Sequence, residues 1–168
     1  MFFKFFRSLS SSKKSVSNHA PLQKAYFSPG NDCLNVIVET LNVAQLTVDI
    51  CVFTISDDRI SRAVFGCHKR GVKVRVITDD DKSLDMGSDV SDFAKKGIKV
   101  KTDKTEAHMH HKFAIIDNRI LINGSYNWTR SAAEYNEENL VVSHDLGLTA
   151  AFSAIFEVLW KKSVLLRV

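Results

Sequence analysis

Short runs of β-branched and apolar residues alternate with amphipathic segments along this chain, and this alternation constrains the fold more than any other feature. Residues 46–55 (LTVDICVFTI) and 72–78 (VKVRVIT) are typical of strands. Between them, residues 56–71 predict a helix that begins at a Ser/Asp cap and ends at Gly71. A strand–helix–strand order favours parallel pairing, because the helix carries the chain back across the sheet.

The same alternation continues along the chain. Further strands are expected at residues 25–28, 98–102, 111–117, 119–124 and 138–143. Further helices are expected from Asp32, over 88–97, near Thr129 and over 145–163. The last helix carries an apolar stripe at helical spacing, formed by Leu148, Phe152, Ile155, Phe156 and Leu159. The pattern predicts one α/β domain whose mixed, partly parallel β-sheet is flanked by helices.

Residues 1–24 differ from the rest of the chain. They are Ser-rich and hold five of the 23 basic residues and no acidic residue, so the rest of the chain carries 18 basic against 19 acidic residues. We therefore place a domain boundary after Lys24 and the folded domain at residues 25–168. Residues 1–9 would suit peripheral membrane contact, and the whole segment resembles an organellar transit peptide. The alternative is a disordered leader, and the compartment stays open between cytoplasm, membrane surface and organelle.

The cysteines give no sign of a metal centre. Cys33, Cys51 and Cys67 are widely spaced and form no C-x-x-C pair, which argues against a disulfide framework or a structural zinc site. Cys51 and Cys67 lie in apolar runs and are expected in the core. No Asp/Glu/His cluster has convincing divalent-metal spacing, so no metal or other cofactor is expected.

Polar groups crowd the ends of one predicted hairpin, residues 108–127 (HMHHKFAIIDNRILINGSYN). Because side chains alternate along a strand, His110 and Lys112 should share one face while His111 takes the other. The imidazole and the ammonium would then lie about 6–7 Å apart along the strand, which suits one phosphate between them. Asp117 falls on the opposite face and should not touch the same anion.

Neutral hydrogen-bonding groups follow the hairpin turn. Gly124 permits close backbone approach, and Ser125 and Asn127 offer uncharged donors. A histidine nucleophile, a lysine and neutral donors form a phosphoryl-transfer site that needs no metal. Taken singly, these residues are ordinary surface or turn residues. Their combination at fixed spacing is what indicates a site.

The same residues resemble the signature of the phospholipase D superfamily. The matching positions are His110, Lys112, Asp117, Gly124, Ser125 and Asn127, and the segment NEENLVV resembles the family's acidic position, on Glu138. The resemblance spans roughly residues 25–160. Within the superfamily it points to single-motif members: bacterial phospholipase D-like endonucleases and the Zucchini-type mitochondrial cardiolipin hydrolase. The chain lacks the Cys/His zinc-binding insertion of the animal Zucchini-type proteins, which favours the bacterial type.

The resemblance implies a homodimer with a shared active site, since the superfamily works with two facing motifs and this chain has one. One His110 would attack phosphorus and form a phosphohistidine, while the partner subunit's His110 would protonate the leaving oxygen. Lys112 and Asn127 would hold the non-bridging oxygens, assisted by Ser125. Glu138 would orient an imidazole, as a carboxylate does in a triad.

Other residues receive secondary roles. Asp117 and Gly124 are expected to be structural members of the motif. His111 is expected to face away from the phosphate and to be structural. His108, Trp128 and Arg130 are candidate substrate contacts.

Three functions compete. The leading hypothesis is a metal-independent endonuclease acting on DNA or RNA, supported by basic residues at 69–75 and 95–104 and by Arg130. These basic residues could instead form a solvated face with interleaved acids at 79–81. The second is a phospholipase D-type hydrolase of cardiolipin or phosphatidylcholine, suggested by the Phe-rich N-terminus and Trp128. A non-catalytic nucleic-acid-binding module is the third, and the complete motif argues against it.

Overall fold

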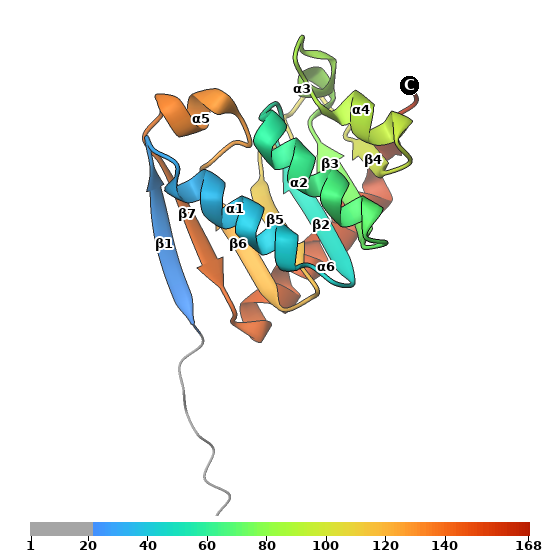
Figure 1. The fold of residues 1–168 in the computed structure, drawn as a ribbon. Coiled ribbons are helices and arrows are strands. Elements are labelled where there is room, and N and C mark those ends of the chain that lie inside the picture. The colour runs from blue at the N-terminus through green and yellow to red at the C-terminus, as the bar shows by residue number, and fades with distance from the viewer. Residues whose placement is uncertain (1–21) are drawn as a thin grey trace, which may run out of the picture.

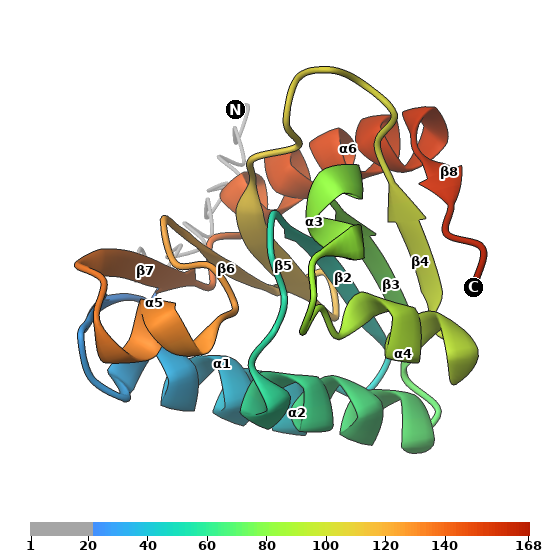
Figure 2. The ribbon, with the colours of Figure 1, turned by 90° about the horizontal axis from the view of Figure 1, so that it is seen from above.

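The computed structural model describes residues 22–168, which form three layers (Figures 1 and 2). One eight-stranded sheet lies in the middle, in the order β1-β7-β6-β5-β2-β3-β4-β8. Helices α1 (Asp32–Val43), α2 (Asp58–Lys69), α4 (Val90–Lys95) and α5 (Arg130–Glu134) lie on one side of the sheet. Helix α6 (Leu146–Lys162) covers the other face, and α3 (Asp80–Leu84) follows the end of β3.

The predicted mixed sheet is confirmed. Its strands are β1 (Gln23–Ser28), β2 (Thr47–Val52), β3 (Lys73–Thr78), β4 (Lys99–Thr102), β5 (Lys112–Ile116), β6 (Ile120–Gly124), β7 (Glu138–Ser143) and β8 (Val164–Leu165). Strand β3 pairs in parallel with β2 and β4, and every other pairing is antiparallel. The boundary expected after Lys24 falls inside β1. The proposed membrane contact at residues 1–9 lies outside the described residues.

Local sequence explains where the helices begin. Asp57, Thr129 and Asp145 each cap a helix by accepting a backbone N–H with a side-chain oxygen, at the starts of α2, α5 and α6. The sequence did not indicate α3 or β8. Helix α3 lies in an Asp-rich stretch without apolar periodicity, and β8 has only two residues.

Two apolar clusters hold the layers together. The larger lies between the sheet and helices α1, α2 and α4, and the smaller joins Phe113 and Ile115 of β5 to Phe156 of α6. The three cysteines are buried and unpaired, so the prediction that Cys51 and Cys67 are core residues is confirmed. Not all of the predicted stripe on α6 faces inward, since Leu148 and Ile155 are exposed. Within residues 22–168, no helix has the length and apolar character that crossing a membrane requires.

The turn between β5 and β6 is fastened to the start of β2. Asp117 and Asn118 both adopt a positive φ of 53°, which gives a tight turn. The Asp117 carboxylate accepts the backbone N–H groups of Gln45, Leu46 and Thr47 at 3.0, 2.7 and 2.9 Å. Burial alone would raise the pKa of Asp117, but these three donors hold it below its ordinary value. Asp117 is thus a structural residue at the end of β5 farthest from His110.

Gly124 is required by the close approach of β6 to β7. A Cβ atom at this position would lie 2.1 Å from the carbonyl oxygen of Asn139 and 2.8 Å from the Cα of Leu140. Both obstacles are backbone atoms, so side-chain rotation cannot relieve the clash.

Gly124→Ala should therefore lower the free energy of unfolding by roughly 1–3 kcal/mol or more, through forced separation of β6 and β7. Gly66→Ala is the matched control, because its Cβ would meet only the side-chain nitrogen of Arg70 at 3.5 Å. In mid-helix that change should stabilise by about 0.5–1 kcal/mol. Urea denaturation of both variants measures the difference. Equal stability of the two would contradict the close approach.

Candidate active site

The strand register gathers the motif at one edge of the sheet. Val52 at the end of β2 pairs with Lys112 at the start of β5. Gly124 at the end of β6 pairs with Leu140 near the start of β7, and Glu138 opens β7. The ends of β2 and β6 thus meet the beginnings of β5 and β7, so residues far apart in sequence converge.

His110 and Lys112 lie against each other at this edge. The Lys112 Nζ is 2.9 Å from His110 Nδ1 and 2.7 Å from the His110 carbonyl oxygen. They are closer than the predicted strand spacing, because β5 begins at Lys112 and His110 precedes it. The His111 ring instead contacts Phe113, with ring centroids 5.6 Å apart. The predicted division of these side chains between two faces is confirmed.

Both motif side chains are biased toward their neutral forms. Burial, then the neighbouring charges of Lys112 and His108, hold the pKa of His110 below its usual value, and Asp79 opposes this shift. Burial likewise lowers the pKa of Lys112, which is 8% exposed, and the charge of Glu138 opposes that shift. A neutral imidazole near pH 7 has the lone pair that a nucleophile requires.

Ser125 and Asn127 follow β6 at the same edge. The Ser125 hydroxyl accepts the N–H of Asn139 at 3.1 Å and is exposed. The Asn127 side-chain oxygen is buried and has no hydrogen-bond partner among residues 22–168. Buried polar atoms are normally paired, and this oxygen is an acceptor, so it suits a donor group of a ligand. A phosphate oxygen would have to be held by the side-chain NH₂ of Asn127.

Glu138 lies near Lys112 but not in the expected contact. Its carboxylate accepts from the Asn136 side chain at 3.2 Å, and its backbone N–H donates to Ser28 Oγ at 3.2 Å. Within the described part of a single chain, no hydrogen bond joins Glu138 to His110. A role in orienting an imidazole therefore stays a prediction.

The three candidate substrate contacts differ in exposure. Trp128 is only 1% exposed and belongs to the core, so its indole cannot touch a substrate and that prediction is wrong. Its backbone instead joins the segment after β2, with Trp128 N–H donating to the Thr54 carbonyl at 3.1 Å. Arg130 is exposed and pairs with Asp58 at 2.9 Å. His108 is half-exposed and lies beside Asp79.

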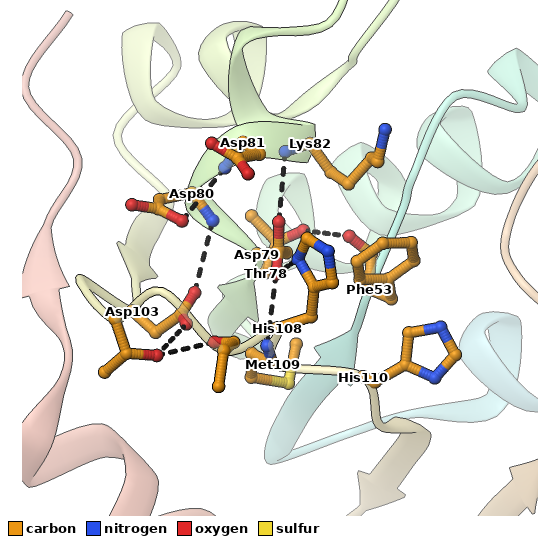
Figure 3. A network of polar contacts seen from close by, with 12 residues as sticks. Phe53, Thr78, Asp79, Asp80, Asp81, Lys82, Asp103, His108, Met109 and His110 are labelled. Atoms are coloured by element: carbon orange, nitrogen blue, oxygen red, sulfur yellow. Dashed lines mark hydrogen bonds and ion pairs between the residues drawn. The ribbon is translucent and has the colours of Figure 1, made fainter.

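Asp79 is the residue that sequence reasoning missed (Figure 3). It follows β3 and is fully buried, whereas the sequence analysis mentioned residues 79–81 only as acids that could be interleaved in a solvated face. Its carboxylate contacts Met109 N and His108 Nδ1, both at 3.1 Å, and accepts Lys82 N–H at 3.2 Å. Its position directly after a predicted buried strand was the signal that could have found it.

Acidic groups near His108 are spaced closely enough to share an ion. Ligand atoms lie within 4.8 Å of one another in two sets, Asp79 with Asp81 and His108, and Asp79 with Asp80 and Asp103. Both sets depend on Asp79, whose two oxygens already accept hydrogen bonds from the chain. The same groups also form a hydrogen-bonded network around Asp79.

Several basic residues that suggested nucleic-acid binding have partners within the chain. Arg75 pairs with Asp49 and Glu157 at 2.7 Å each. Arg70 donates to the Leu41 carbonyl at 2.9 Å, and Lys101 donates to the Trp160 carbonyl at 2.6 Å. These three cations thus make contacts within the chain.

Comparison with known proteins gives the family. Residues 37–160 match the family model described as cardiolipin synthase, PLD-like domain. The chain is 51% identical over 127 residues to a mitochondrial cardiolipin hydrolase of Chlamydomonas reinhardtii, covering 76% of this chain and 57% of that one. A human protein of the same name is 40% identical over 133 residues, covering 79% and 53%. The chain thus spans about half the length of these relatives.

A solved structure shows the same fold. The phospholipase D family member Nuc from Salmonella typhimurium superposes with a TM-score of 0.83 at 24% identity, covering 89% of this chain and 100% of that one. The shared fold agrees with the matched family model. The chain belongs to the phospholipase D-like domain family.

Proposed function

We propose that this protein is a metal-independent phosphodiesterase that works through a phosphohistidine on His110. The observation that carries the proposal is the contact of 2.9 Å between His110 Nδ1 and Lys112 Nζ at the edge where the other motif residues meet. A lowered pKa keeps the imidazole neutral, and the adjacent ammonium is placed to bind the oxygens of the phosphate under attack.

Lys112 would change partners when substrate binds. An ammonium has three donors, and two of them are directed at His110 Nδ1 and at its carbonyl oxygen in the free chain. Because Lys112 can only donate, Nδ1 of a neutral His110 accepts and the ring proton lies on Nε2. A phosphodiester would draw Lys112 onto a non-bridging oxygen, which frees the ring to adopt the tautomer that attack requires.

The reaction needs a second proton-transfer group. A ring nitrogen of His110 would form a bond to phosphorus while the leaving oxygen departs with its bonding electrons and takes up a proton. We propose that in a homodimer the partner subunit's His110 carries a proton when substrate binds and gives it to the leaving oxygen. The resulting neutral imidazole then takes a proton from the water that hydrolyses the phosphohistidine. Lys112, Asn127 and Ser125 would hold the non-bridging oxygens, and Glu138 would orient an imidazole.

Cardiolipin is the substrate that we place first, with nucleic acid second. Two relatives at 51% and 40% identity are named mitochondrial cardiolipin hydrolase. Arg70, Arg75 and Lys101 are engaged within the chain, which weakens the electrostatic argument for a nuclease. Lys104 is exposed and lines the same pocket as His110, and it keeps nucleic acid as the second candidate. Arg130 is also exposed, although it pairs with Asp58. We also propose an organellar location, which the acid-free N-terminal segment would suit.

The wild-type protein should hydrolyse its substrate in the presence of EDTA, because a histidine nucleophile needs no metal. We would assay cardiolipin, phosphatidylcholine, single-stranded DNA and RNA side by side, and expect cardiolipin to react fastest. Loss of turnover in EDTA that Mg²⁺ or Zn²⁺ restores would contradict the histidine mechanism. Faster cleavage of DNA or RNA would overturn the order of the substrates.

His110→Ala should reduce turnover of bis-p-nitrophenyl phosphate on the order of 10³-fold or more, since it removes the nucleophile. His111→Ala is the matched control, because its ring lies on the other face against Phe113. It should retain most activity, with circular dichroism checking the fold of both variants. Comparable losses in two folded variants would mean that the assignment of the nucleophile is wrong.

A shared active site predicts that two inactive chains cannot rescue each other. When His110→Ala and Lys112→Ala chains are mixed, every dimer lacks at least one essential group, so activity should stay low. Sedimentation equilibrium of the wild-type protein should show a dimer at assay concentration. A fully active monomer would refute the shared site.

A further inference from the structure

His110 lies outside the hydrogen-bonded ladder of the sheet. Strand β5 begins at Lys112, and the segment from residue 103 to residue 111 has no regular structure. On its C-terminal side the segment is fixed where Phe53 N–H donates to the His111 carbonyl at 2.9 Å. A second contact must fix the backbone on the N-terminal side of His110, because a catalytic group needs its position held on both sides.

Asp79 provides that second attachment. Its Oδ2 accepts the backbone N–H of Met109 at 3.1 Å and lies 3.1 Å from His108 Nδ1 (Figure 3). A carboxylate only accepts hydrogen bonds, so Nδ1 of His108 carries a hydrogen and Nε2 is turned away from Asp79. Both contacts are made to residues directly before His110.

The burial of Asp79 shows that these contacts matter to the fold of the site. A fully buried carboxylate is unfavourable unless donors surround it. Only one of its three partners, the N–H of Lys82, lies in its own helix cap. The other two belong to a segment 29 and 30 residues away.

Phe53 connects the two attachments. Its ring contacts the imidazoles of His108 and His110, with centroids 5.4 and 4.6 Å apart, and Lys112 Nζ lies 5.0 Å from the ring centroid. Thr78, next to Asp79, donates its hydroxyl hydrogen to the Phe53 carbonyl at 3.0 Å. The residues at the ends of β2 and β3 therefore hold the ring of Phe53 against both His108 and His110.

We propose that Asp79 is a positioning residue of the active site. It fixes the Met109 backbone and the His108 ring, and through them it holds His110 beside Lys112. The inference rests on the proposed function for its kinetic consequence, but the placement of His108 and His110 can be measured without turnover.

The kinetic test compares Asp79→Asn and Asp79→Ala with Asp103→Asn. Asp103 holds the other end of the same segment, because its carboxylate accepts from Asp80 N at 3.2 Å and from Thr105 Oγ1 at 3.1 Å. Among residues 22–168, no hydrogen bond joins Asp103 to His108 or Met109. Both Asp79 variants should lower kcat for bis-p-nitrophenyl phosphate on the order of 10- to 100-fold, because a misplaced nucleophile reacts slowly. KM should change less than about twofold, and Asp103→Asn should leave kcat unchanged.

Two kinetic outcomes would overturn the proposal. One is an unchanged kcat in a folded Asp79 variant. The other is an equal fall in Asp103→Asn, which would indicate general loosening of the segment. Thermal unfolding checks that each variant is folded. His108→Ala, at a half-exposed position, removes one of the two contacts and should give a smaller loss of kcat than Asp79→Ala.

The second test uses NMR of ¹⁵N-labelled histidines. In wild-type protein the neutral His108 ring should carry its proton on Nδ1, and a proton on Nε2 would refute the contact with Asp79. The titrating groups that face His110 are Lys112 and His108, which lower its pKa, and Asp79, which raises it. Asp79→Asn should therefore lower the pKa of His110 further and move the acidic limb of kcat/KM to lower pH.

An unchanged pKa of His110 in Asp79→Asn would overturn the proposed placement. These measurements also separate the two proposals. If wild-type protein fails to hydrolyse every phosphodiester offered, the proposed function fails. The histidine tautomer and the pKa shift would still decide whether Asp79 holds this segment.

Discussion

The pairing of β5 with β2 is the interaction on which the rest of the molecule depends. Antiparallel pairing of Val52 with Lys112 brings the end of β2 to the start of β5, and the next hairpin brings the end of β6 to the same edge. A register shift of one residue would turn Lys112 toward α6 and Phe113 toward the other cluster. The position of the reactive pair and the composition of both apolar clusters are therefore set by one alignment.

Much of this arrangement could be predicted from sequence because it follows from periodicity. Alternation of side chains along residues 110–116 separates His110 and Lys112 from His111, and β-branched runs mark the central strands. The same reasoning missed Asp79, since a charged residue in an acidic stretch has the composition of a surface. Trp128 was misjudged for the related reason that exposure depends on tertiary packing, which brings its segment beside Thr54 and Ile55.

The electrostatics of the site follow from where its charges are buried. Lys112 is nearly enclosed, and its charge disfavours a proton on the neighbouring imidazole of His110. Two negative charges act in the other direction: Glu138 raises the pKa of Lys112, and Asp79 raises the pKa of His110. Binding of an anionic phosphate would favour the charged form of Lys112 further.

Strand β2 lies in the sheet between β3, its parallel neighbour, and β5, its antiparallel neighbour. The chain leaves the carboxyl end of β2 toward α2, and the segment after β4 enters β5 beside that end. The segments near this edge, residues 79–89 and 103–111, belong to no central strand. These segments can therefore change in length or sequence without changing the sheet, so the surroundings of His110 can vary while its supporting strands stay the same.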